Sequence, residues 1–127
     1  MKTLTIGDLK ARIPIIQGGM GVGISLSGLA SAVANEGGIG VISAAGLGLL
    51  YKKLSPSNYT EAGNLGLAEE IRKAREKAKG IIGVNVMVAL SDFAELVKTS
   101  IAEKVDIIFS GAGLPLDLSL IHISEPT

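Results

Sequence analysis

Four short apolar runs divide the chain, and a serine, asparagine or glutamine stands at or near the end of each. The runs cover residues 13–16, 40–43, 81–87 and 106–110. They are short and rich in β-branched side chains, which favours strands that are buried on both faces. The pattern therefore predicts four buried β-strands.

A helical pattern of apolar residues follows the first run. It predicts a helix over 26–36 with Ser25 or Ser27 as its N-cap, because a serine hydroxyl can accept a hydrogen bond from the first turn. Gly37 and Gly38 come directly after this segment, where a glycine commonly ends a helix. We expect these two glycines to close the helix.

Two more helices are predicted further along the chain. The segment from about 65 to 79 carries acidic residues first and basic residues later, an order that suits the helix dipole, and Gly80 closes it. The segment 92–104 forms the third helix, with Ser91 or Asp92 as its N-cap.

Strands and helices alternate in the order β-α-β-α-β-α-β. Such alternation predicts parallel strands joined by right-handed crossovers. Residues 47–63, which include Pro56 and several serine, asparagine and tyrosine residues, are expected to form a long loop after the second strand. A loop in this position either covers a ligand or is a disordered insertion, and the sequence leaves both readings open.

The junction between the first strand and the first helix is rich in glycine. Within residues 14–23 the glycines are Gly18, Gly19, Gly21 and Gly23. A strand, a glycine turn and a helix N-terminus can hold an anion, because the backbone approaches closely and helix N–H groups point at the charge. The alternative is a turn that only lets the helix pack on the sheet.

The spacing of these glycines excludes two known nucleotide motifs. A dinucleotide-binding turn needs glycine at positions i, i+2 and i+5. Counted from Gly19 the third position is Ile24, and counted from Gly21 it is Leu26. The second strand also lacks an acidic residue for a ribose at its end, and the chain has no P-loop sequence.

Polar side chains stand at the carboxyl ends of the predicted strands. They are Gln17, Ser43, Asn85 and Ser110. In a parallel α/β barrel, active sites are built at this end of the strands. Asn85 is the most informative of them, because its amide lies within an otherwise apolar strand and needs hydrogen-bond partners. It either ties a neighbouring loop to the sheet or binds a cofactor.

Composition narrows the class of protein. Of the 127 residues 47% are hydrophobic, and the formal net charge is zero, which argues against nucleic acid or an anionic membrane surface as partner. The chain has no cysteine, so neither a disulfide, a thiolate metal site nor a cysteine nucleophile is expected. No metal site of any kind is predicted.

The charged residues and the chain start add two expectations. Glu69, Glu70 and the basic residues after them are expected to form a solvated helix face with pairs three or four residues apart. The N-terminus lacks the pattern of a signal peptide, and no apolar run reaches the length of a transmembrane helix. We therefore expect a cytoplasmic protein.

Four segments of the chain carry a family resemblance. They are PIIQGGMG at 14–21, GGIGVI at 37–42, GVNVM at 83–87 and GAGLP at 111–115. Together they resemble the nitronate monooxygenases, formerly called 2-nitropropane dioxygenases, over about residues 4–118. The same superfamily contains the flavin-dependent enoyl-acyl-carrier-protein reductases.

The resemblance implies an α/β fold, namely the first half of a (β/α)8 TIM barrel with about four βα units. It implies FMN at the mouth formed by the carboxyl ends of the strands. The backbone around Gly19, Met20 and Gly21 would lie against the flavin, and Asn85 would bind the FMN. The glycine turn is then expected to contact the flavin ring, while glycine-rich loops that this chain lacks hold most of the phosphate.

The activity implied by the resemblance is the oxidation of alkyl nitronates with dioxygen, with the flavin carrying the redox chemistry. An NAD(P)H-dependent flavin enoyl-thioester reductase of the same superfamily is the alternative. A more distant alternative is a non-catalytic α/β phosphate-binding module. The expected partners are a small-molecule substrate and dioxygen, without nucleic acid or membrane. The sequence is also compatible with a homo-oligomer.

A complete barrel needs about 250 residues, so residues 1–117 are expected to be its N-terminal half. The family's histidine near the substrate belongs to a later strand, so the catalytic residue is unknown.

Residues 118–127 resemble the in-frame translation of a sequencing adaptor and are expected to be a non-native tail, which leaves His122 without a role. Because the sheet edges of a half-barrel are open, we expect it to be inactive, unstable or oligomeric, and a poor FMN binder.

Overall fold

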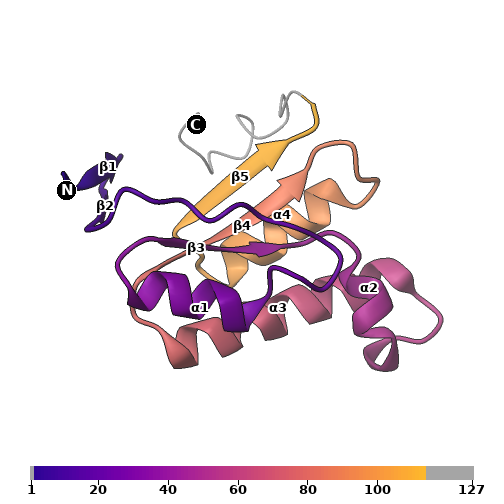
Figure 1. Ribbon diagram of the computed structural model, residues 1–127. Coiled ribbons are helices and arrows are strands. Elements are labelled where there is room, and N and C mark those ends of the chain that lie inside the picture. Colours follow the sequence, from indigo (N-terminus) through magenta and orange to yellow (C-terminus); the bar gives the residue numbers. More distant parts are fainter. Residues whose placement is uncertain (1, 114–127) are drawn as a thin grey trace.

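The computed structural model describes residues 2–113 of the chain, in which strands and helices alternate after an N-terminal hairpin (Figure 1). The elements are β1 Leu4–Ile6, β2 Leu9–Ala11, α1 Ser27–Asn35, β3 Ile39–Ser43, α2 Leu47–Leu50, the 3-10 helix η1 Lys52–Leu54, α3 Tyr59–Lys77, β4 Ile81–Met87, α4 Phe93–Ala102 and β5 Ile107–Gly111. The predictions for His122, for the tail 118–127 and for residues 114–115 lie outside the described part of the chain.

A parallel sheet of three strands, in the order β3-β4-β5, forms the centre of the described residues. Its register places Ser43 opposite Asn85 and, on the next strand, Asn85 opposite Phe109. Three of the four predicted strands are thereby confirmed, together with their parallel direction. The sheet agrees with part of a barrel, and the predicted number of about four βα units is not confirmed.

The first predicted strand, 13–16, runs parallel to β3 but pairs with it only at one isolated bridge, Ile16 to Ile39. The N–H of Ile39 donates to the Ile15 carbonyl at 2.9 Å, and the Gln17 N–H donates to the Ile39 carbonyl at 3.0 Å. The Ile15 N–H, which would continue the ladder, donates instead to the Ile13 carbonyl at 2.8 Å in a tight turn around Pro14, so no regular ladder runs through this segment. The position of the prediction is correct, and its assignment as a full strand is wrong.

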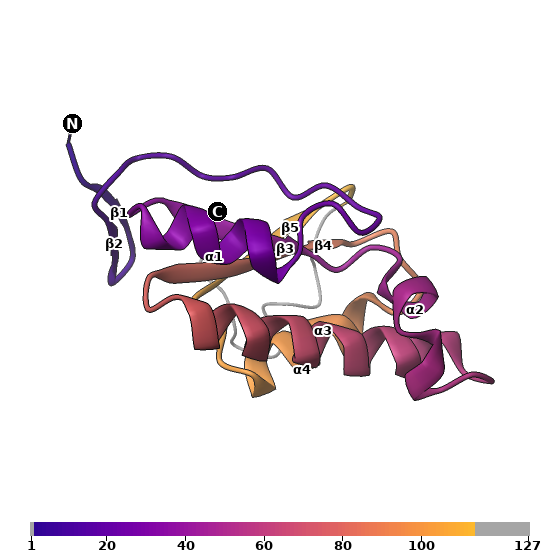
Figure 2. The same ribbon diagram turned by 60° about the horizontal axis from the view of Figure 1, so that its bottom comes forward.

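Helices α1, α3 and α4 cover one face of the sheet (Figures 1 and 2). Alternate strand residues point into this layer, and the main core consists of Ala30, Ala34, Ile42, Leu67, Ile71, Ala74, Ile82, Val84, Val86, Leu96 and Val97, with smaller contributions around them. A period of two along each strand therefore separates a helix-covered face from the opposite one, here called the inner face.

The inner face is closed at the amino-terminal ends of its strands by the β1–β2 hairpin. Side chains of the hairpin pack there with the first residues of the strands in a second cluster, which contains Leu4, Ile6, Leu9, Ala11, Ile39, Val41, Ile81, Ile107 and Phe109. The hairpin was not among the predicted elements. Its sequence signal is the Gly7-Asp8 turn, in which Gly7 has a φ of +55°.

The two ends of α1 differ in how well they were predicted. At the C-terminus Gly37 has a φ of +96° and its N–H donates to the Ala34 carbonyl at 3.1 Å, which confirms the glycine closure. At the N-terminus the cap position is Leu26, without a side-chain hydrogen bond. The prediction of Ser25 or Ser27 as N-cap is wrong, because Ser25 bonds to the glycine turn instead.

Helix α3 begins at Tyr59, six positions before the predicted start at about 65. Its N-cap is Asn58, whose side chain accepts a hydrogen bond from the Glu61 N–H at 3.0 Å. Residues 47–50 and 52–54 are helical turns as well, so the prediction of a continuous long loop over 47–63 is wrong. Asp92 does hold the N-cap position of α4, without a side-chain bond.

The layers approach most closely where α1 crosses β3. A Cβ atom on Gly40 would overlap the main-chain carbonyl of Ala30, so no side chain fits between helix and strand. Within the described residues no helix combines the length and apolar character needed to cross a membrane.

Gly40→Ala is expected to destabilise the chain by about 1–3 kcal/mol, because the added methyl group overpacks this contact. The matched control is Gly28→Ala, whose Cβ would lie in open space on α1. That change should stabilise the helix by roughly 0.5–1 kcal/mol. Urea unfolding of both variants measures the difference, and equal free energies of unfolding would contradict the close contact.

Candidate functional site

The glycine turn lies across the carboxyl ends of β3 and β4. A Cβ atom on Gly19 would be 2.7 Å from the Asn85 Cβ, and one on Gly21 would be 2.9 Å from the Ala45 Cβ and 3.3 Å from the Ser43 hydroxyl. Only glycine allows the backbone to pass so close to these side chains. The structure therefore brings Gly19, Gly21 and Asn85, which the sequence nominates separately, into one place.

Ser25 fixes the conformation of this turn. Its hydroxyl accepts a hydrogen bond from the Met20 N–H at 3.0 Å and donates to the Gly18 carbonyl at 3.3 Å. Its backbone N–H donates to the Met20 carbonyl at 2.9 Å, and its carbonyl accepts from the Ser43 N–H at 2.8 Å. These bonds tie both ends of the turn to each other and to the end of β3, and the Ser25 side chain is buried among them.

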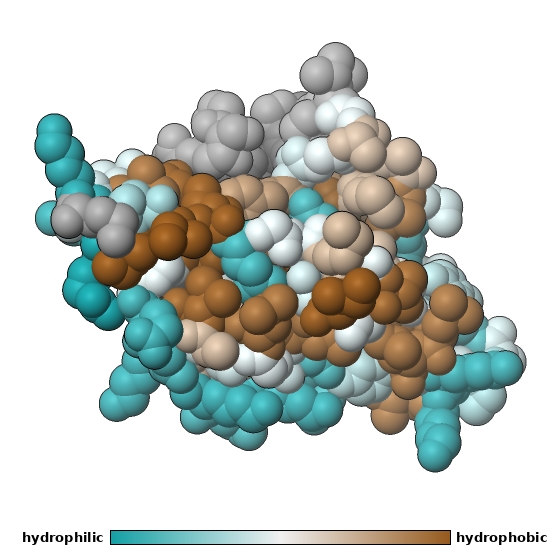
Figure 3. Space-filling view, viewed as in Figure 1, coloured by the Kyte–Doolittle hydropathy of each residue, from teal (hydrophilic) through white to brown (hydrophobic). Residues whose placement is uncertain are grey.

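Met20 lies at the centre of the turn and is exposed, with 58% of its surface accessible. Val22 and Ile24, further along the turn, are 48% and 62% accessible. Hydrophobic residues form a broad band across this view of the molecule (Figure 3). Exposed apolar residues that gather beside a backbone turn provide a surface that a flat apolar group can cover.

Asn85 projects from the inner face of β4 beside the turn. It is partly buried, and its amide Nδ2 donates a long hydrogen bond of 3.5 Å to the Phe109 carbonyl of β5. This is the only side-chain hydrogen bond of Asn85 to another described residue. A weak tie to β5 is thus present, and the amide keeps capacity for a further partner.

Gln17 has a different role from the other polar residues at the strand ends. Its Nε2 donates to the Val41 carbonyl at 2.9 Å, and its Oε1 accepts from the Val41 N–H at 3.0 Å. Both halves of the amide are therefore paired with β3. Gln17 extends the pairing of the irregular segment 13–17 rather than facing a ligand.

Helix α1 begins directly after the turn, and its first N–H group is already paired with a carboxylate. The Ser27 N–H donates to Glu70 Oε1 at 2.8 Å, and the Tyr51 hydroxyl donates to Glu70 Oε2. The Lys73 ammonium lies 3.8 Å from the same oxygen. Only 4% of Glu70 is accessible, so its prediction as part of a solvated helix face is wrong.

The sequence did contain a signal for the buried position of Glu70. It lies three residues after Leu67 and four before Ala74, in the apolar stripe of α3 that also contains Ile71. Ser25 and Tyr51, the other residues of this region that were not singled out for these roles, have no comparable periodic signal. Tyr51 bonds to Glu70, 19 positions away, whereas Ser25 bonds both within its own turn and to Ser43 of β3.

The environment of Glu70 favours its charged form. Burial alone would raise the pKa of Glu70, but hydrogen bonds from Tyr51 and Ser27 and the charge of Lys73 outweigh burial, so its pKa is lowered from the ordinary value of 4.5. Burial, then the bond to Glu70, raises the pKa of Tyr51. The network is therefore a carboxylate held by a neutral phenol and a nearby ammonium.

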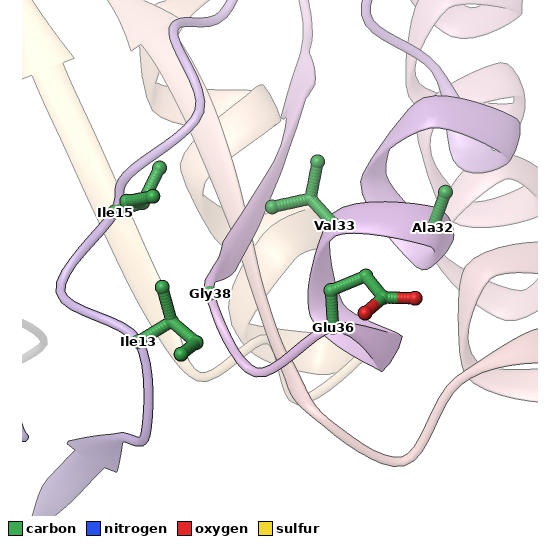
Figure 4. A pocket seen from close by; sticks show the side chains of 6 residues that line it. All are labelled: Ile13, Ile15, Ala32, Val33, Glu36 and Gly38. Atoms are coloured by element: carbon green, nitrogen blue, oxygen red, sulfur yellow. The ribbon is translucent and has the colours of Figure 1, made fainter. Parts of the chain in front are cut away.

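An apolar groove lies elsewhere on the surface, between the segment 13–15 and α1 (Figure 4). It has a volume of about 310 Å³ and is lined by Ile13, Ile15, Ala32, Val33, Glu36 and Gly38. Its walls are apolar apart from one carboxylate, so it lacks the converging polar groups of a reaction site. In residues 2–113 no three His, Cys, Asp or Glu side chains gather in a way that could hold a metal ion.

Comparison with known proteins shows the family to which the chain belongs. A sequence profile of the family described as nitronate monooxygenase matches residues 2–114, nearly the whole chain. The chain belongs to the nitronate monooxygenase family, which confirms the resemblance of its four motifs. A search of curated proteins finds no match.

Solved structures show which known folds this chain is similar to. The chain is similar to FabK from Thermotoga maritima, with 31% identity and a TM-score of 0.63, over 80% of this chain and 28% of that one. A FabK mutant from the same organism matches at 32% identity and a TM-score of 0.63, over 80% of this chain and 29% of that one. The chain thus spans less than a third of the length of these solved proteins.

Glu70→Gln is expected to lower the free energy of unfolding by about 1–3 kcal/mol at neutral pH, because the amide loses the charge-assisted bonds. A carboxyl whose pKa is lowered on folding stabilises the fold fully above its unfolded pKa and loses that effect as the pH falls through the folded pKa. The difference between the two proteins should therefore shrink as the pH falls below the ordinary value of 4.5. Urea unfolding over a pH series measures it, and a pH-independent difference would contradict a charged Glu70.

Proposed function

We propose that this chain is the flavin-contacting part of an FMN-dependent oxidoreductase that oxidises alkyl nitronates with dioxygen. Membership of the nitronate monooxygenase family supports this reaction. The observation that carries the proposal is the close packing of Gly19 and Gly21 on Asn85 and the end of β3. It sets an exposed apolar turn at the carboxyl end of parallel strands, where barrel enzymes bind their ligands.

The residues of the turn fit the flavin ring system in their chemistry. The backbone of 19–21 has no side chain on the sheet side and the apolar Met20 side chain on the exposed side. The Asn85 amide can donate to or accept from the polar edge of the bound cofactor. When bound, FMN would supply the electron-transfer chemistry, while these residues bind it, orient it and exclude water from one side.

An enoyl-thioester reductase that uses NAD(P)H is the second candidate. The similarity to FabK, at 31% identity over 80% of the chain, is the observation that favours it. We expect the residues that distinguish the two reactions, like the family's histidine near the substrate, to lie outside residues 2–113. No catalytic residue is assigned within residues 2–113.

The two reactions differ in what they consume. With an alkyl nitronate and dioxygen, the whole flavin-loaded enzyme of which this chain is the proposed part should consume oxygen without added NAD(P)H. With an enoyl thioester, an enoyl reductase should instead oxidise NAD(P)H, and this outcome would replace the first proposal by the second. A protein that binds inorganic phosphate but shows no flavin absorbance would contradict both and favour a phosphate-binding module.

Gly19→Ala is expected to weaken FMN binding, because the new Cβ would meet Asn85 and shift the turn or the amide. A strain of about 1–3 kcal/mol corresponds to a loss of affinity of roughly 5- to 150-fold. Gly18→Ala is the matched control, since its Cβ would have no neighbour within 4 Å. Titration of flavin fluorescence measures both dissociation constants, and an equal affinity of the two variants would argue against flavin at this turn.

A further inference from the structure

The position of Glu70 matters because of the motif that it serves. In a strand, glycine turn and helix arrangement, the free N–H groups of the first helical turn are the place where an anion binds. Here the N–H of Ser27, the first residue of α1, already donates to Glu70 Oε1 at 2.8 Å. The carboxylate comes from α3, 43 positions further along the chain.

We propose that Glu70 is a specificity-determining residue that fills the anion position at the start of α1 and so keeps phosphate groups away from the glycine turn. The turn is then left to an uncharged, apolar part of a ligand. The last step rests on the proposed flavin function, whereas the occupation of the anion position does not.

Several contacts hold the carboxylate in this position. The Tyr51 hydroxyl donates to its second oxygen, and Lys73 lies 3.8 Å away while its ammonium also donates to the Tyr51 hydroxyl at 3.3 Å. With both oxygens bonded and 4% of the residue accessible, the carboxylate is not free to move aside for a ligand. A phosphate at the same N–H groups would meet a fixed negative charge.

The sequence around the turn supports the same conclusion independently. Residues 13–35, which include the whole turn and α1, contain no charged side chain. A phosphate in the turn would therefore have no lysine or arginine from this segment as partner. The exposed side chains of the turn are instead the apolar Met20, Val22 and Ile24.

The test restores an anion to a chain that lacks the carboxylate. In Glu70→Ala, formate should bind near Ser27 and slow hydrogen exchange in peptides that cover 18–30. At a formate concentration about ten times its dissociation constant, exchange should slow roughly tenfold. Formamide, the uncharged counterpart, should protect less, because the position favours negative charge.

The wild-type chain and one further variant serve as controls. Neither formate nor inorganic phosphate should change exchange at 18–30 in the wild type, where the position is filled. Glu61→Ala removes an exposed carboxylate from the first turn of α3 and so changes the net charge equally, without opening the position beside Ser27. It should behave as the wild type does.

The outcomes that overturn the proposal are distinct. They are protection of the wild-type turn by phosphate, absence of formate protection in Glu70→Ala, and equal protection by formamide. If Glu70→Ala loses its helical circular-dichroism signal, Glu70→Ser takes its place, because a small polar residue tolerates water in the opened space. Because no flavin is present in this experiment, its outcome does not depend on whether the proposed flavin function is correct.

Discussion

The carboxylate of Glu70 beneath the first turn of α1 is the contact on which the candidate site most depends. Through it, α3 holds the start of α1, and Ser27 at that start lies two residues after Ser25, which anchors the glycine turn. Tyr51 brings the segment between α2 and η1 to the same carboxylate. One buried charge thus fixes the relative positions of three segments that are far apart in the sequence.

Small residues set the second constraint. The chain has no tryptophan, two phenylalanines and two tyrosines, so its layers are not held apart by large rings. Backbone instead meets backbone or side chain directly at Gly40 against α1 and at Gly19 against Asn85. Interiors packed at this density respond to a single added methyl group, which makes these contacts precise and also intolerant of change.

The sequence was sufficient to predict the alternating elements, because buried parallel strands leave short β-branched runs between amphipathic helices. The family resemblance named Gly19, Gly21 and Asn85 as site residues, and the structure places them together at the carboxyl ends of β3 and β4. Which role Asn85 has toward a ligand stays a prediction. Family membership followed from the motifs, whereas the reaction that the protein performs stays a proposal.

The features that sequence reasoning missed depend on contacts between distant segments or on local exceptions. Pro14 interrupts a run that otherwise has the composition of a strand. Asn58 and Glu61 start α3 early through a local capping bond that apolar periodicity does not register. Glu70 sits among surface charges in the sequence, and only its place in the apolar stripe of α3 distinguishes it from Glu69.

The two bonds between Gln17 and Val41 have a further consequence for how the chain leaves the sheet. A primary amide resembles the peptide group, because an N–H donor and a C=O acceptor lie side by side in one plane. After the bond from the Gln17 N–H to the Ile39 carbonyl, the side chain pairs with Val41 in place of the main chain, which is therefore free to leave β3. Two residues after Gln17, at Gly19, the backbone lies against Asn85 of β4. A glutamate at this position would have no donor for the Val41 carbonyl, so the geometry of the mouth depends on an amide that no ligand needs to touch.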